Sequence, residues 1–424
     1  MVNRHVRWWV LLLGLAARAQ VKTDMGVYPL PALPTFGAAG SKVVDPTFGT
    51  TILRLTDGAQ GNTQCTVTYS NIAAFNADST WVVTRCAPNS VAVLFQIDPV
   101  TFTRLQRRTL SSAPSGLYQY WSIWSGINPN VLYVPSASAV YAYDVAAQTF
   151  SVSTQASSVL GSGETFDWQM SRSADDKIFA NKFLINGSDG GYLAWRIEST
   201  GAKTVLLKVT ITGTNEVQID KSGRFLSVVM DTNGPDNSIW DLSTTPPTEL
   251  KTTHGFRHYD SGHGTLFTSY EPRSLGFRSL LAPNTLVKML PDDAWSYLNQ
   301  QDHFSMQADN ELWALASRYR IGTSTASYPG CVNNICPFDD ELTQVATDGS
   351  QRVRRLAHHR SLMPPGGYLE APMANMSKNG ALIAFTSNWG NVSGRLDAYL
   401  LQVPPAPWPA DTVAPSFPLN LVVQ

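Results

Sequence analysis

A phrase of two strands recurs seven times along this chain of 424 residues. Each copy has an apolar run, a polar turn and a second apolar run. The copies lie near residues 71–83, 121–134, 167–180, 216–230, 258–269, 303–316 and 372–386. Most are roughly 40 to 50 residues apart, a period typical of units that can bury their apolar faces only against one another. The repeat therefore predicts a ring or stack of similar units.

A third and a fourth strand follow the repeated phrase in most copies. The third often ends in an aromatic residue beside a charge, as at Tyr143-Asp144 and Trp240-Asp241, and the fourth is more polar, as at residues 248–252 and 352–356. Only 15% of the residues are charged, and 30 glycines and 26 prolines supply turns. Four antiparallel strands at this period predict an all-β fold, a seven-bladed β-propeller.

Residues 50–56 form a lone strand before the first copy, and the last copy supplies only three strands. We predict that the early strand completes the last blade, because this closure removes two exposed sheet edges. The propeller then spans residues 50–403. An insertion at about residues 319–337 interrupts the sixth blade and is predicted to be a loop.

The two ends of the chain lie outside the predicted propeller. Residues 1–19 have the pattern of a secretory signal peptide, with Arg4 and Arg7 before an apolar run and small residues at Ala17 and Ala19. A lead segment, residues 20–49, follows. We predict a secreted chain, extracellular or periplasmic, of net charge about −4 after cleavage. No later run predicts a membrane span and no basic stretch predicts nucleic-acid binding.

The C-terminal residues 404–424 are rich in proline and are predicted to form a linker. Within them, residues 411–416 resemble the opening of a fibronectin type III module, so the linker is expected to lead to an appended module that this sequence does not contain.

Four cysteines are present, and export favours disulfides over metal sites. We predict the pairs Cys65–Cys86 and Cys331–Cys336. Neither pair has the two-residue spacing of a zinc knuckle.

The turns of the repeat, Lys221-Ser222-Gly223-Arg224 and Ser377-Lys378-Asn379-Gly380, resemble those of WD40-like, TolB-type propellers. This resemblance covers residues 52–403 and implies the fold. The chain also resembles secreted propeller polysaccharide lyases, above all oligogalacturonate lyase, in which histidines and a glutamine bind a divalent metal. Gln301 and His303 lie near one another here, but the spacing differs from the ligand pattern of that family, so no ligand is carried over.

All six histidines of the predicted mature chain fall within its second half: His254, His258, His263, His303, His358 and His359. We aligned the copies on the residue before each turn, which is Phe75, Trp124, Met170, Ile219, Ser261, Met306 or Met376. Three residues earlier, four consecutive copies have Asp167, Glu216, His258 and His303. The first strand of a propeller blade lines the central channel, so these four side chains are expected to meet at one opening.

This cluster predicts two kinds of chemistry. His258, His303, Asp167 and Glu216 are a candidate site for a divalent metal, Mn, Ca or Zn. Alternatively, His258 or His303 acts as a general base, Arg257 holds an anionic group, and Tyr259 donates a proton. Substrate-binding candidates are His254, His358, His359, Arg360 and Trp121.

Both kinds of chemistry suit β-elimination of a uronate glycan, in which the carboxylate charge must be neutralised before the neighbouring proton becomes acidic. We therefore predict a polysaccharide lyase with a polysaccharide or oligosaccharide as its partner. The alternative is a non-catalytic propeller that binds glycans or proteins through Tyr120, Trp121 and Trp124. A plain structural interpretation also stands, because polar residues often line wet channels without chemistry.

Overall fold

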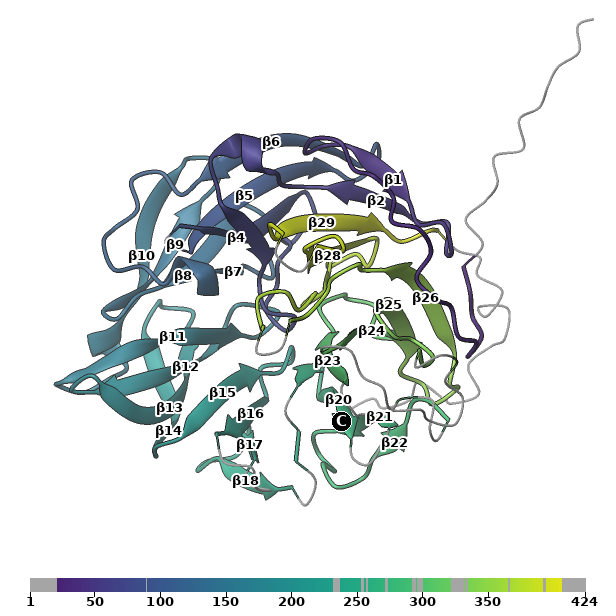
Figure 1. The fold of residues 1–424 in the computed structure, drawn as a ribbon. Helices are drawn as coiled ribbons and strands as arrows, with labels where there is room; N and C mark the ends of the chain where they lie inside the picture. Colours follow the sequence, from purple (N-terminus) through teal and green to yellow (C-terminus); the bar gives the residue numbers. More distant parts are fainter. Residues whose placement is uncertain are drawn as a thin grey trace, which may run out of the picture.

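The protein forms a ring of seven antiparallel sheets around a central axis (Figure 1). The computed structural model describes residues 21–405, apart from residues 89, 232–236, 253–254, 257, 271–273, 292–294, 296–299, 322–331, 333–334, 365–366 and 392–393. Six of the sheets have four strands and one has five. The predicted all-β, seven-bladed propeller is confirmed. The predicted signal peptide and nearly all of the predicted linker lie outside the described residues.

The first three blades follow one another in the chain. Blade 1 contains β3 (Gln64–Val67), β4 (Trp81–Ala87), β5 (Val91–Asp98) and β6 (Thr103–Thr109). Blade 2 contains β7 (Ile123–Trp124), β8 (Val131–Pro135), β9 (Ala139–Asp144) and β10 (Thr149–Gln155). Blade 3 contains β11 (Glu164–Arg172), β12 (Ile178–Ile185), β13 (Ser188–Ile197) and β14 (Lys203–Thr210).

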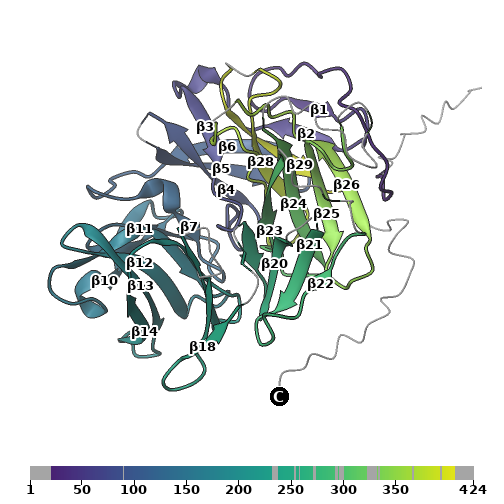
Figure 2. The ribbon, with the colours of Figure 1, turned by 60° about the horizontal axis from the view of Figure 1, so that its bottom comes forward.

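The next three blades repeat this order. Blade 4 contains β15 (Thr214–Ile219), β16 (Phe225–Met230), β17 (Ser238–Asp241) and β18 (Thr248–Lys251). Blade 5 contains β19 (Tyr259–Ser261), β20 (Thr265–Tyr270), β21 (Ser274–Ser279) and β22 (Val287–Lys288). Blade 6 contains β23 (Gln300–Ser305), β24 (Trp313–Arg320), β25 (Glu341–Ala346) and β26 (Val353–His358). Figure 2 shows the strands of blade 6 following one another outward from the centre of the ring.

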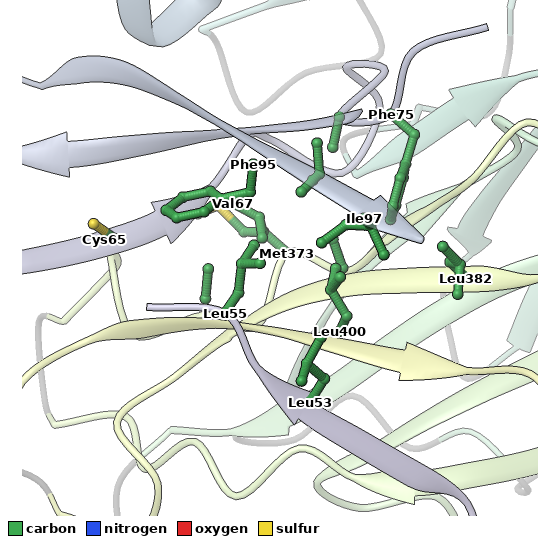
Figure 3. Packing of buried hydrophobic residues seen from close by; sticks show 14 of the residues in the cluster. Leu53, Leu55, Cys65, Val67, Phe75, Phe95, Ile97, Met373, Leu382 and Leu400 are labelled. Carbon is green, nitrogen blue, oxygen red and sulfur yellow. The ribbon is translucent and has the colours of Figure 1, made fainter. Parts of the chain in front are cut away.

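Blade 7 joins the two ends of the chain. Its inner strands are β27 (Asn375–Met376), β28 (Leu382–Ser387) and β29 (Asp397–Gln402), and its outer strands are β2 (Thr51–Arg54) and β1 (Lys42–Val44). Ile52 on β2 pairs with Leu401 on β29, so the predicted closure by the N-terminal strand is confirmed. Figure 3 shows Leu53 of β2 beside Leu400 of β29, near Val67 and Phe95 of blade 1. The fifth strand, β1, comes from the lead segment and was not predicted.

The blades pack face to face, so their central strands are buried on both sides. Every residue of β28 is buried, whereas every residue of the outermost strand β6 is partly or fully exposed. Branched and aromatic side chains favour such strands. The turns set the spacing between blades: Gly223 has φ 75°, and a Cβ there would lie 2.9 Å from Cγ1 of Ile178 in blade 3.

Two inner strands differ from the repeat alignment. In blade 1, β3 forms the start of the inner strand, residues 68–74 leave the sheet, and pairing resumes at Phe75 opposite Val82. In blade 3, Arg172 pairs with Phe179, so Arg172 and not Met170 precedes the turn. The slip of two residues arises because the turn begins at Ser173, whose amide donates to the Ile178 oxygen, and not directly after Met170. A bulge between Phe166 and Met170 lies further up the same strand.

The cysteines follow the predicted pairing where the structure describes them. Cys65 and Cys86 face each other on β3 and β4 and form a disulfide. Cys336 is also disulfide-bonded, but its predicted partner Cys331 lies outside the described residues. Among the described residues, no helix is long and apolar enough to cross a membrane.

Candidate functional site

The inner strands of all seven blades begin on the same face of the ring, because each blade repeats the same antiparallel order. Side chains near these strand starts surround the entrance to the central channel. We call the following set the mouth: Tyr69, Tyr120, Trp121, Trp168, His258, His303, Tyr319 and Tyr368. They come from blades 1, 2, 3, 5 and 6 and from the connection between blades 6 and 7.

Two histidines from neighbouring blades stack at the mouth. His258 stands just before β19 and His303 lies on β23, and their ring centroids are 4.4 Å apart. Nδ1 of His258 lies 2.5 Å from the backbone oxygen of Asp302, which can only accept a hydrogen bond. In the neutral imidazole, this contact places the proton on Nδ1 and leaves the lone pair on Nε2. The His258 side chain is 27% exposed, so this lone pair is on an accessible ring.

His303 lies behind His258 and is fully buried. Neither of its ring nitrogens has a hydrogen-bond partner among the residues that the structure describes. Its ring stacks on Tyr319 at 5.5 Å and meets the edge of Tyr69 at 5.1 Å. Burial lowers the pKa of His303 well below its usual value, and the nearby His258 lowers it further. His303 is therefore a neutral imidazole at neutral pH.

Aromatic rings extend the mouth across blades 1 to 3. Trp121 and Trp168 stack with centroids 4.3 Å apart, and Tyr69 lies 6.4 Å from Trp121. The Lys182 ammonium is 5.2 Å from the Trp168 ring centre and 3.5 Å from the Asp167 carboxylate. Aromatic faces beside cations suit the apolar faces of sugar rings and the charges on acidic sugars.

The segment of residues 68–74 crosses the channel from blade 1. The Asn71 amide donates a hydrogen bond to Glu216 of blade 4, and Gln307 of blade 6 donates to the Asn71 backbone oxygen at 3.2 Å. Asn375 holds the segment by donating to the oxygens of Ser70 at 2.9 Å and of Ile72 at 2.5 Å. These bonds hold the segment within the central channel, between blades 1, 4, 6 and 7.

Glu216 is a buried carboxyl group in the channel wall. Burial raises its pKa to about 8, and the charge of Asp260 acts in the same direction, although the hydrogen bond from Asn71 opposes them. Glu216 is therefore mostly protonated at neutral pH, and it adds little negative charge to the channel below the mouth.

Replacing Glu216→Gln is expected to make stability less dependent on pH. Between about pH 4.5 and 8 the folded wild-type chain holds a proton that the unfolded chain releases. Wild-type stability should therefore fall through this range by up to about 1.4 kcal/mol per pH unit because of this group. The stability of the variant relative to wild type should rise from pH 5 to pH 8 in urea denaturation. A difference that stays constant with pH would contradict the assigned protonation of Glu216.

The four predicted metal ligands do not come together. His258 and His303 are neighbours, but Asp167 pairs with Lys182 and Glu216 bonds to Asn71. The slip in blade 3 explains the position of Asp167, because Gln169 is the true counterpart of Glu216. Within the described ranges, no group of three or more His, Cys, Asp or Glu residues could hold a metal ion. The described residues thus supply two imidazoles and no further ligands, and no chemical step is derived through a metal.

The predicted proton donor lies away from the mouth, and two further predicted residues lie outside the described part of the chain. Tyr259 is buried in the core of blades 4 and 5, with its ring against Phe256 and its hydroxyl 3.5 Å from the Ser227 oxygen. It therefore cannot meet a substrate at the mouth. His254 and Arg257 lie outside the described residues.

The lead segment covers the cluster His358, His359 and Arg360. Nε2 of His358 lies 3.1 Å from the Tyr28 oxygen, and Arg360 donates to the Pro31 oxygen at 2.8 Å. Nε2 of His359 lies 2.8 Å from the Arg318 oxygen, while its Nδ1 accepts from the Ser361 amide at 3.0 Å. All three side chains are buried. These contacts replace the predicted substrate binding with a structural role under the lead segment.

Sequence reasoning missed five residues at or near the mouth: Tyr69, Trp168, Tyr319, Tyr368 and Arg85. Arg85 was detectable as a charged residue within the apolar strand β4, where a blade packs on both faces. The three tyrosines lie in a channel-crossing segment, at a strand end and in a connection, and the repeat pattern marks none of these positions.

The fold and the mouth together define a class: a seven-bladed propeller with an aromatic and histidine-lined opening on one face. No protein-family model matches the sequence, and no curated protein sequence does. Among solved structures, an oligogalacturonate lyase in complex with manganese is similar, with a TM-score of 0.59 and 13% identity over 91% of this chain and 98% of that chain. An oligogalacturonate lyase from Vibrio parahaemolyticus has a TM-score of 0.59 and 11% sequence identity over 92% of this chain and 99% of that chain. TolB from Acinetobacter baumannii has a TM-score of only 0.37 and 14% sequence identity over 76% of this chain and 77% of that chain. At these identities the likeness shows the fold alone.

Proposed function

We propose that the protein is a secreted, carbohydrate-active propeller that cleaves an acidic oligosaccharide or polysaccharide by β-elimination at the mouth. The observation that carries the proposal is the state of His258. Its Nδ1 proton is fixed by the Asp302 oxygen, and its Nε2 lone pair lies on a partly exposed ring among aromatic side chains. The Cys65–Cys86 disulfide is consistent with export.

His258 would act as the general base. In β-elimination, Nε2 takes the proton from the sugar carbon beside the carboxylate, a carbon–carbon double bond forms, and the bond to the leaving sugar oxygen breaks. The imidazolium formed would lie 3.9 Å from the Asp302 carboxylate, which favours its charge. The buried His303 stacked behind His258 stays neutral and so does not oppose this protonation.

Tyr368 would return a proton to the leaving oxygen. Tyr368 is 50% exposed, and its ring centroid lies 6.4 Å from that of His303. Its hydroxyl is therefore placed beside the histidine pair, where a substrate oxygen could accept its proton. This assignment replaces Tyr259 as the proton donor.

The similarity to two oligogalacturonate lyases supports the choice of a uronate substrate. One of those structures contains manganese, and a divalent metal would supply charge neutralisation of the substrate carboxylate if this chain bound one. His258 and His303 are the described residues that would contribute to such a site.

The test is to incubate the protein with oligogalacturonates and other uronate glycans, in chelator and with added Mn, Ca or Zn. Unsaturated uronate ends absorb ultraviolet light, and we expect their absorbance to grow with time. Absence of this product from every glycan and metal condition would refute the lyase. Binding without product would identify the alternative, a non-catalytic glycan-binding propeller.

A further inference from the structure

A hollow opens at the mouth between blade 1, the segment that enters blade 2 and the connection to blade 7. Its empty space, which is open to solvent, is about 440 Å³, and its lining includes Thr66, Arg85, Tyr120, Trp121 and Tyr368. Tyr368 and Trp121 also belong to the mouth, so the hollow and the histidine pair share a wall. A substrate chain at the mouth can therefore extend into the hollow.

Among the described residues that line this hollow, Arg85 is the one cation. It stands on β4 opposite Thr66, and its guanidinium lies 5.0 Å from the centre of the Tyr120 ring. Among the described residues, no carboxylate pairs with Arg85 and no acceptor forms a hydrogen bond with it. Burial lowers its pKa, but arginine keeps its charge in proteins. A partly buried cation without a counter-ion favours an anionic ligand.

The surroundings of Arg85 are rigid and carry no resident anion. The next residue, Cys86, is joined to Cys65, which fixes β4 to β3 beside the hollow. The lining residues that the structure describes carry hydroxyl groups, aromatic rings and apolar side chains but no Asp or Glu side chain. A planar guanidinium held in place can bind a carboxylate through two parallel hydrogen bonds.

We propose that this hollow is a subsite for a uronate residue, in which Arg85 binds the sugar carboxylate and Tyr120 and Trp121 contact the sugar ring. The subsite rests on the proposed function for its substrate class, and it makes Arg85 the residue that selects acidic over neutral sugars. Its role is in binding, separate from the proton transfers assigned to His258 and Tyr368.

The test compares binding of oligogalacturonate and of a neutral galacto-oligosaccharide by calorimetry. Arg85→Gln is expected to weaken binding of the acidic ligand by about 10- to 100-fold, because a hydrogen bond between charged groups is lost. Binding of the neutral ligand should stay within about twofold of wild type. Arg85→Lys, which keeps the charge but not the paired geometry, should fall between the two.

Arg108→Gln is the matched control. Arg108 is also on blade 1 and its guanidinium lies 5.1 Å from the Trp81 ring, but it stands on the outermost strand β6. The Arg108→Gln variant should bind the acidic and the neutral ligand with wild-type affinity. Equal losses for acidic and neutral ligands, no loss in Arg85→Gln, or the same loss in Arg108→Gln would overturn the subsite, as would a folded wild-type chain that does not bind the acidic ligand.

The readout is binding, so it separates the subsite from the lyase. Selective, Arg85-dependent binding by a wild-type protein that forms no unsaturated product would uphold the subsite and refute the lyase. If the wild-type protein forms unsaturated product and Arg85→Gln binds the acidic ligand as tightly as wild type does, the lyase is upheld and the subsite is refuted. Circular dichroism of each variant checks that the ring has folded.

Discussion

His258→Gln is expected to lower the rate of uronate cleavage by at least about 100-fold, while the affinity for the substrate stays within about threefold. Glutamine can still donate a hydrogen bond to the Asp302 oxygen, but it has no lone pair basic enough to take the carbon-bound proton. The loss should therefore appear in kcat and not in KM. Initial rates of unsaturated product formation over a range of substrate concentrations measure both quantities.

His263→Gln provides the control for this experiment. His263 belongs to the same blade but follows β19 in the turn at its opposite end, where it is 53% exposed and lies 2.8 Å from Glu311. Its rate should equal that of wild type within about twofold. A His258 variant with nearly full activity would show that another group is the base, and an equal loss in both variants would indicate damage to blade 5 as a whole.

Leu53→Ala is expected to lower the free energy of unfolding by about 2 to 5 kcal/mol. Leu53 is fully buried on β2, where it packs with Leu400 of β29 and with blade 1 (Figure 3). Truncation leaves a cavity in the sheet that joins the two ends of the chain. Urea denaturation followed by circular dichroism measures the change.

Val44→Ala is the matched control in the same sheet. Val44 lies on β1 and is 57% exposed, so its truncation should change stability by no more than about 0.5 kcal/mol. If Leu53→Ala unfolds with the wild-type midpoint, the closing strand does not limit the stability of the ring. If Val44→Ala loses as much as Leu53→Ala, the effect does not arise from burial.

The number of blades and their closure were predictable because both follow from local patterns. Paired apolar runs mark the inner strands. The early strand has no partner nearby and the last blade lacks one strand, so pairing the two closes the ring. The register of the strands within each blade was harder to predict. In blade 3 the inner strand continues through Ser171 and Arg172 before the turn, and these polar residues look like part of the turn in the sequence. The copy was therefore aligned two residues too early, and Asp167 was assigned to the channel for that reason.

The candidate site was predictable only in part. His258 and His303 do meet, because equivalent positions of adjacent blades are neighbours in a ring. His358 and His359 were placed at a substrate surface because the lead segment has no repeat that could show where it packs. Arg85 could be noticed as a charge within an apolar strand, but its place in a hollow depends on Tyr368 and Leu369, in a connection far along the chain.

The Asn71 crossing has a consequence for how a polymer could be handled. The segment of residues 68–74 is bonded to blades 4 and 6 across the bore, so it stands in the path of a glycan that would thread through the ring. If the proposed function holds, a long glycan would lie along the outer surface and place a single stretch at the histidine pair. Its fragments would then leave on the side from which the chain arrived, so product release and entry of the next stretch would compete.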